Sequence, residues 1–474
     1  MIDFQPIRAR GQAPSLVEQL AAAILQGIEA QTLRPGMALP SVRECARQYG
    51  VSTFTVASAY SRLVSQGWLA ARPGAGYRVA TPDAPARPAR APAWEPPRLN
   101  AAWLLSDIFA DHSIPIKSGC GWLPGEWLNE EGLHLALRHM GRVPAMRIAN
   151  YGHPYGYAPL RDTIAASLGA QGMEVEASQV VLTQGVTHGL DMVIRTLLRP
   201  GDTVLVEQPA YANLLQMLRL AGLRAVAVPR TLDGLDCEAL DAAVARHRPR
   251  ALFINTVLQN PSGASIGMAN AFRILQAAER HGLWVIEDDI SRELAPGVTP
   301  MLAALDGARR VVYLGGYSKV ISPSVRVGYV VAHRDLARDI ARTKMAVGLT
   351  SPEIMERIVH QVIREGRYRA HIARTRERLA EAHASVAQLM AQHGFDVYGR
   401  PQGGLFLWAR PGGQWRERGA SGLAELALKD GIWLAPGSYF EVDEADTPWI
   451  RFNVAYSDAP ELWRFMRNTG AWDG

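Results

Sequence analysis

At 474 residues the chain is longer than one hydrophobic core usually serves, so we expect two or three domains. No apolar run reaches the length that spans a membrane, and the first residues lack the apolar core of a signal peptide, which predicts a cytoplasmic protein without a membrane partner. The three cysteines lie far apart without C-x-x-C spacing, so neither a disulfide framework nor a metal site is expected.

The positive charge is concentrated near the N-terminus. The whole chain has a net charge of +5, and residues 1–98 alone hold eleven arginines against six acidic residues, so the remainder sums to zero. A basic excess confined to one part of a chain is typical of a module that binds a polyanion such as DNA.

Residues 1–80 have the pattern of a small helical domain. Apolar side chains recur every four residues from Leu16 to Ile28, which predicts a first helix. A capping box of Ser41 and Glu44 opens a second helix, and Ser52 caps a third. The stretches "WLAA", "RPGA" and "GYRV" then predict two short strands joined by a tight turn. Three helices and such a wing predict a winged helix-turn-helix, although any small helical domain shows some of these signals.

Residues 81–98, "TPDAPARPARAPAWEPPR", are rich in Pro, Ala and Arg and have almost no bulky aliphatic side chain. Such a segment cannot pack, so we expect an extended, semi-rigid spacer of polyproline type. The spacer separates the domain of residues 1–80 from a large domain of residues 99–474.

The large domain alternates apolar runs such as "QVVLTQG", "DTVLVEQP", "RALFINTV" and "LWVIEDD" with helical stretches. This rhythm predicts an α/β fold around a largely parallel sheet, in which binding sites lie at the carboxyl ends of the strands. Polar residues of the kinds that carry chemistry follow several of these runs.

Lys319 follows the run "VVYLGGYS" in a chain with only four lysines. Pyridoxal phosphate chemistry needs a lysine amine for an imine, a carboxylate that keeps the pyridine nitrogen protonated, and donors for the phosphate. Asp288, at the end of "LWVIED", supplies the carboxylate, and Arg326 supplies a guanidinium. Residues 185–187 precede a helix that we expect to begin near His188, which suits a phosphate. Tyr211 is an aromatic residue that can cover a ring face.

From "PSLVEQL" at residue 14 to "GAGYRV" at residue 79, the chain resembles the GntR family of bacterial transcription regulators. The resemblance implies a winged helix-turn-helix that binds double-stranded DNA. Where family members often have an arginine and a threonine at the start of the third helix, this chain has Thr53 and Phe54, which suggests altered base readout. The DNA contacts that the resemblance implies fall on Arg43 of the second helix, on Ser52, Thr53 and Thr55 of the third, and on Arg72 and Gly74 at the wing tip.

From Asn150 to Arg451 the order of motifs resembles class I aminotransferases of fold type I, with a large and a small subdomain. The joined chain resembles the MocR subfamily of GntR regulators. The resemblance implies an internal aldimine on Lys319, a pyridinium partner in Asp288 and a substrate or effector carboxylate on Arg451. It also implies a homodimer, because Tyr151 would contact the cofactor of the partner subunit. The remaining cofactor contacts that it implies are Val186, Thr187, Ser318 and Arg326 to the phosphate, Tyr211 to the ring and Asn260 to the phenolic oxygen.

Two departures from the enzyme pattern bear on activity. Aminotransferases usually have a tyrosine two or three residues after the aspartate, but this chain has Ile290 and Ser291 there, and Gly316 replaces a hydroxyl residue often used on the phosphate. We therefore expect a transcription regulator that senses pyridoxal phosphate, or an amino compound that reacts with it. The alternative is an active aminotransferase in which DNA binding is secondary. A third reading is a metabolite-binding protein that uses neither activity.

Overall fold

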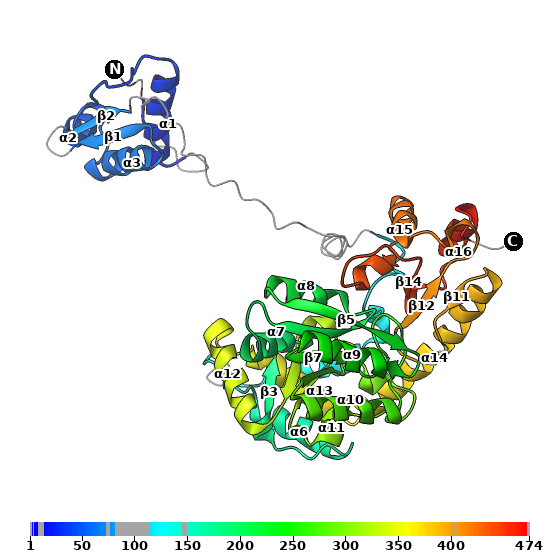
Figure 1. Ribbon diagram of the computed structural model, residues 1–474. Coiled ribbons are helices and arrows are strands. Elements are labelled where there is room, and N and C mark those ends of the chain that lie inside the picture. The colour runs from blue at the N-terminus through cyan, green and yellow to red at the C-terminus, as the bar shows by residue number, and fades with distance from the viewer. Residues whose placement is uncertain are drawn as a thin grey trace. The chain divides into compact units, whose positions relative to one another are not determined.

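The computed structural model describes residues 2, 4–7, 14–72, 76–80, 114–144, 149–399, 401 and 403–471. The chain divides into two compact units, Met1–Pro97 and Arg98–Gly474 (Figure 1). The predicted spacer of residues 81–98 and Gly74 of the predicted wing tip lie outside the described residues. Within the described ranges, no helix has both the length and the apolar character to cross a bilayer.

The N-terminal unit contains three helices and a two-stranded antiparallel sheet. The helices begin where serine side chains bind free backbone N–H groups. Ser41 Oγ accepts from Glu44 N at 3.3 Å while the Glu44 carboxylate accepts from Ser41 N at 3.0 Å, which confirms the predicted capping box. Ser15 forms a second capping box, with Glu18. The elements are α1 (Leu16–Glu29), α2 (Val42–Tyr49), α3 (Thr53–Ser65), β1 (Leu69–Arg72) and β2 (Gly76–Val79).

One small hydrophobic core holds these elements together. Leu20 and Ile24 of α1 pack against Val56, Tyr60 and Leu63 of α3, and all five side chains are fully buried. Leu20 and Ile24 are positions of the four-residue apolar spacing, and Val56, Tyr60 and Leu63 recur at the three- and four-residue spacing of one helix face. The wing strands pair antiparallel, so that three helices followed by a wing are present as predicted.

The C-terminal unit is built on an eight-stranded mixed sheet of order β3-β10-β9-β8-β7-β4-β5-β6. The pairs in the middle of the sheet, from β9 to β5, are parallel, whereas β10 is antiparallel to both neighbours and β6 is antiparallel to β5. The strands are β3 (Val180–Thr183), β4 (Thr203–Gln208), β5 (Arg224–Thr231), β6 (Gly234–Leu235), β7 (Ala251–Asn255), β8 (Trp284–Asp288), β9 (Val311–Gly316) and β10 (Gly328–Val331).

Helices cover both faces of this sheet, which explains why its strands are apolar at nearly every position. Successive side chains of a strand point to opposite faces. In β7, Leu252 and Ile254 belong to a hydrophobic cluster with α6, α9, α10, α11, α13 and α14, whereas Phe253 belongs to a second cluster with α7, α8 and α12. These helices are α6 (Ala158–Gly169), α7 (Val186–Leu197), α8 (Ala212–Leu220), α9 (Cys237–His247), α10 (Met268–His281), α11 (Leu302–Asp306), α12 (Arg334–Gly348), α13 (Glu353–Arg364) and α14 (Tyr368–Gln392).

A second, four-stranded antiparallel sheet follows the long helix α14, which leads to it from the large sheet (Figure 1). Its order is β11-β12-β14-β13, so β14 is an interior strand. The elements are β11 (Asp396–Val397), β12 (Phe406–Arg410), α15 (Ala420–Lys429), β13 (Ala435–Pro436), β14 (Ile450–Asn453) and α16 (Pro460–Asn468). Ile116 and Gly119 lie beside the stretch that leads into β13, with backbone hydrogen bonds to residues 431 and 433.

Candidate functional site

Lys319 lies three residues beyond β9, at the carboxyl edge of the large sheet. Its side chain is partly buried, and Nζ donates a hydrogen bond to the carbonyl oxygen of Gly121. Burial, and next the positive charge of Arg451, lower the pKa of the Lys319 amine to about 8. A lysine at this pKa is partly neutral near pH 7, which is the form that reacts with an aldehyde.

Asp288 ends β8, the strand beside β9. Burial raises the pKa of its carboxyl to about 6, against the hydrogen bond that Ile290 N donates to Oδ1 at 3.3 Å. Glu207 raises this pKa further, and Lys319 lowers it. The arrangement places a carboxylate near the lysine in a site where a positive partner would hold it ionised.

The start of α7 forms a cradle that suits an anion. The helix begins at Val186, two residues earlier than predicted, so that Val186 and Thr187 are its first residues and Gly185 is its cap. Gly185 has φ +81, and a Cβ there would lie 2.6 Å from a guanidinium nitrogen of Arg326. Free N–H groups of a helix start and an arginine fork therefore lie side by side. Ser318, the residue before Lys319, is buried.

Tyr211 occupies the position just before α8, in contact with Thr187 of the cradle and near enough to Asp288 to feel its charge. Its phenolic oxygen accepts a hydrogen bond from Asn213 Nδ2 at 3.1 Å, and Thr187 also contacts it. Burial raises the pKa of the phenol, and the charge of Asp288 raises it further. The predicted ring-covering residue is thus close to the predicted phosphate and pyridine partners.

Arg451 lies in the interior strand β14, and its side chain is 6% exposed. Nη1 donates to Asn260 Oδ1 at 2.8 Å and Nη2 to Gly119 O at 2.5 Å, while the guanidinium carbon is 4.6 Å from the ring centre of Phe406. Its Nε is buried and has no hydrogen-bond partner in the part of the chain that the structure describes. Arg451 is thus a buried, oriented cation rather than an arginine at the edge of a sheet.

The loop of residues 119–121 is part of the site, and sequence reasoning missed it. Its carbonyl oxygens accept from both Arg451 and Lys319, and Asn453 Nδ2 donates to Cys120 O at 3.2 Å. Glycine is required at position 119, because a Cβ there would lie 2.6 Å from the backbone of Leu434. The two glycines of "SGCGW" were the available signal for a close backbone approach.

A buried polar network behind the site was also missed. Glu207 accepts from Arg230 Nη1 at 2.5 Å and from Asn255 N at 2.9 Å, and both charged side chains are almost fully buried. Asn255 then accepts from Asn260 N at 2.9 Å and donates to Asp288 O at 2.7 Å. The network therefore positions the segments that carry Asn260 and Asp288.

Tyr151 does not join the site within one chain, because its side chain is 82% exposed. In the N-terminal unit, Arg43, Ser52 and Thr53 are exposed, but Thr55 is buried and its hydroxyl lies 2.8 Å from Ser52 Oγ. A direct base contact by Thr55 would require this side chain to leave its position. The side chain of Arg72 and all of Gly74 lie outside the described residues.

Two family models match the chain. Residues 136–468 match aminotransferase class I and II, and residues 16–79 match bacterial regulatory proteins of the gntR family. The chain belongs to the MocR subfamily of GntR regulators. It is therefore a DNA-binding regulator joined to an aminotransferase-like domain of fold type I, and its cofactor is pyridoxal 5'-phosphate.

The relatives include both regulators and enzymes. The chain is 29% identical to the transcriptional regulator YdcR of Escherichia coli over 93% of this chain and 94% of that protein, and 30% identical to the probable rhizopine catabolism regulatory protein MocR of Rhizobium meliloti over 80% and 77%. It is 32% identical to 2-aminoadipate transaminase of Thermus thermophilus over 79% of this chain and 94% of the enzyme.

Solved structures agree with this assignment of the fold. The α-aminoadipate aminotransferase LysN of Thermus thermophilus, complexed with N-(5'-phosphopyridoxyl)-L-leucine, has a TM-score of 0.68 at 29% identity and covers 74% of this chain and 92% of its own. The kynurenine aminotransferase of Pyrococcus horikoshii has a TM-score of 0.72 at 22% identity, over 79% and 94%, and shows the fold alone.

Proposed function

We propose that this protein is a cytoplasmic, homodimeric regulator whose binding to DNA responds to pyridoxal phosphate, or to an amino compound that reacts with it at Lys319. The main support is the loop of residues 119–121, which accepts hydrogen bonds from Lys319 and Arg451 and follows the predicted spacer by 21 residues along the chain. Lys319 and Arg451, which would bind the ligand, thus donate hydrogen bonds to the part of the C-terminal unit that follows the predicted spacer in the sequence.

The residues present fit the cofactor. Gly185 leaves space beside Arg326 where any larger residue would collide, and the buried Nε of Arg451 has no partner among the described residues. Pyridoxal phosphate, when bound, supplies an aldehyde that condenses with primary amines and a ring that withdraws electrons from them. Lys319 presents the amine, and Asp288 would hold a proton on the pyridine nitrogen.

The other residues of the site bind and orient. Arg326, Ser318 and the first N–H groups of α7, at Val186 and Thr187, would hold the phosphate. Tyr211 would cover the ring, and Asn260 would contact the phenolic oxygen. Arg451, already oriented by Asn260 and Gly119, would bind the carboxylate of an amino compound.

Ligand binding changes the bonding of the loop in this proposal. When Lys319 and Arg451 turn toward a cofactor or a carboxylate, the carbonyl oxygens of Gly119 and Gly121 lose their side-chain donors. A ligand then stabilises one arrangement of the loop over another, and DNA binding responds only as far as the two arrangements differ in affinity for the operator.

An exposed surface around Tyr151 supports the homodimer. Tyr151 precedes Gly152, and a Cβ on Gly152 would lie 3.4 Å from Glu353, the first residue of α13, and from the carbonyl oxygen of Ser351 just before it. Leu349 and Ile354, on the same stretch of chain as these residues, are exposed apolar side chains. A second copy of the chain would cover this surface and would bring Tyr151 to the partner's cofactor.

The alternative is an active aminotransferase. It is favoured by the proximity of Lys319, Asp288 and Arg451 and by the transaminase among the relatives. Against it, Ile290 and Ser291 stand where aminotransferases usually have a tyrosine on the phenolic oxygen. We therefore propose weak turnover at most.

The deciding experiment measures binding to the DNA upstream of this protein's own gene, at fixed salt, with and without pyridoxal phosphate. Wild type is compared with Lys319→Ala and with Lys429→Ala, which removes an exposed lysine. We expect the cofactor to change affinity or footprint in wild type and Lys429→Ala only. No binding by wild type in either state, together with rapid conversion of an amino acid to its keto acid, would reverse the order of the two proposals.

A further inference from the structure

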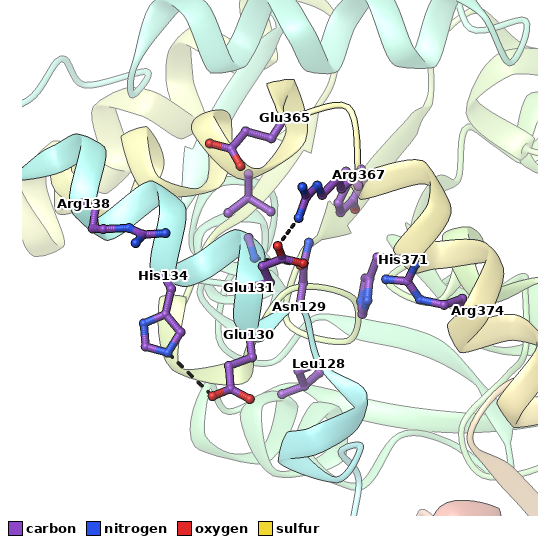
Figure 2. A pocket seen from close by; sticks show the side chains of 13 residues that line it. Leu128, Asn129, Glu130, Glu131, His134, Arg138, Glu365, Arg367, His371 and Arg374 are labelled. Atoms are coloured by element: carbon purple, nitrogen blue, oxygen red, sulfur yellow. Dashed lines mark hydrogen bonds and ion pairs between the residues drawn. The ribbon is translucent and has the colours of Figure 1, made fainter.

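A second groove lies away from the Lys319 site, between α5 (Glu130–Met140) and the start of α14. Its volume is about 610 Å³, which is within the range of small-molecule sites. Figure 2 shows Arg138 and Glu131 on the α5 side and Arg367, His371 and Arg374 on the opposite side. The groove thus has charged walls from two helices that the sequence separates by more than two hundred residues.

Three glutamates and three arginines line the groove, and only Glu131 and Arg367 form an ion pair between a carboxylate and a guanidinium. Glu131 pairs with Arg367, Glu130 lies 3.6 Å from His134, and Glu365 accepts from Gln361 at 3.3 Å. Arg138 and Arg374, by contrast, make no ion pair or hydrogen bond within the described ranges. Two guanidinium groups on opposite walls are therefore available to a ligand with two negative charges.

The floor of the groove contains a buried histidine. His371 is 6% exposed, and its Nε2 lies 3.0 Å from the carbonyl oxygen of Val320, the residue that follows Lys319. A carbonyl only accepts, so Nε2 carries a proton. The other ring nitrogen, Nδ1, has no hydrogen-bond partner among the residues described, although the ring lines the groove. Nδ1 is not among the fully buried polar atoms of the described residues, so it can bond to a ligand or to solvent in the groove.

We propose that this groove is a second ligand site, which takes a small dianion with carboxylate or phosphate groups through Arg138 and Arg374. In this proposal His371 relays the occupancy of the groove to Lys319. A ligand that contacts His371 changes the strength of the hydrogen bond from the imidazole to Val320 O, and Lys319 is the residue just before Val320. Tyr368, which also lines the groove, donates to Glu293, five residues after Asp288, so a second contact reaches the same site. The protein then combines two inputs, a reactive amino compound at Lys319 and an unreactive dianion in the groove.

The test uses the full chain loaded with pyridoxal phosphate, so that the α7 cradle is filled. Inorganic phosphate and glutarate are titrated separately by calorimetry, which shows whether the groove prefers phosphate or dicarboxylate. The variants are Arg374→Gln and Arg138→Gln, with Arg369→Gln as a control on the same helix outside the groove and Arg451→Gln to exclude binding at the Lys319 site. The absorption spectrum of the bound cofactor is recorded during each titration.

We expect at least one probe to bind in the groove, with affinity reduced roughly tenfold or more in Arg374→Gln and in Arg138→Gln and unchanged in Arg369→Gln, whereas Arg451→Gln should remove only binding at the Lys319 site. Saturation should also change the cofactor spectrum of the wild type. Failure of both probes to bind at millimolar concentration, or binding to Arg451→Gln that survives both groove substitutions, overturns the site. Binding that leaves the spectrum unchanged overturns the relay. Neither measurement contains DNA, so these failures are distinct from failure of the proposed function.

Discussion

The pKa of Lys319 sets how fast the cofactor is captured, because only a neutral amine attacks an aldehyde. Burial and the charge of Arg451 lower this pKa from the ordinary 10.5 to about 8. At pH 7 about one Lys319 side chain in ten is then neutral, against about three in ten thousand for an unshifted lysine. The environment of Lys319 therefore increases the reactive fraction by roughly 300-fold at this pH.

We expect the rate of pyridoxal phosphate capture by the cofactor-free protein to rise with pH and to level off above about pH 8. Arg451→Gln removes the second-largest cause of the lowered pKa, so its rate profile should shift to higher pH and its rate at pH 7 should fall several-fold. Arg410→Gln, which removes an arginine paired with Asp396 on the same small sheet, should behave as the wild type.

The measurement is stopped-flow absorbance of the cofactor between pH 6 and 10. The reasoning is refuted if the wild-type rate still rises tenfold per pH unit up to pH 10, because the amine would then have an unshifted pKa. It is also refuted if the profiles of Arg451→Gln and the wild type coincide.

Two further predictions concern the phosphate cradle and the network behind it. Gly185→Ala places a methyl group 2.6 Å from the Arg326 guanidinium, so we expect pyridoxal phosphate affinity to fall at least tenfold by equilibrium titration. Gly172→Ala, with a similar positive φ and open space, should keep full affinity, and equal losses in both would implicate backbone strain alone. Arg230→Met leaves Glu207 buried without its cation, and we expect a loss of about 3–5 kcal/mol in urea unfolding of the C-terminal unit. Adding Glu207→Gln should restore much of that stability, and a single-variant loss below about 1 kcal/mol would contradict this account.

The sequence alone was sufficient wherever a local pattern determines the structure. The capping box of Ser41 and Glu44 and the apolar stripe of α1 depend on residues within a turn or two, and the structure contains both. Asp288 could be placed at a strand end because an apolar run of that length stops there. The type of fold and the cofactor followed from the order of such motifs along the chain.

Tertiary structure decided what depends on contacts between distant residues. Gly121 lies 198 residues before Lys319, and no spacing rule connects the carbonyl of one with the amine of the other. The burial of Arg451 follows from the position of β14 between two strands, which the sequence of β14 does not contain. The groove of Arg138 and Arg374 exists because α13 brings α5 and the start of α14 together. Local preferences act over a few residues, whereas these pairings form only when the whole core has packed, and so the sequence revealed neither the hydrogen bonds of the site nor the loop of residues 119–121.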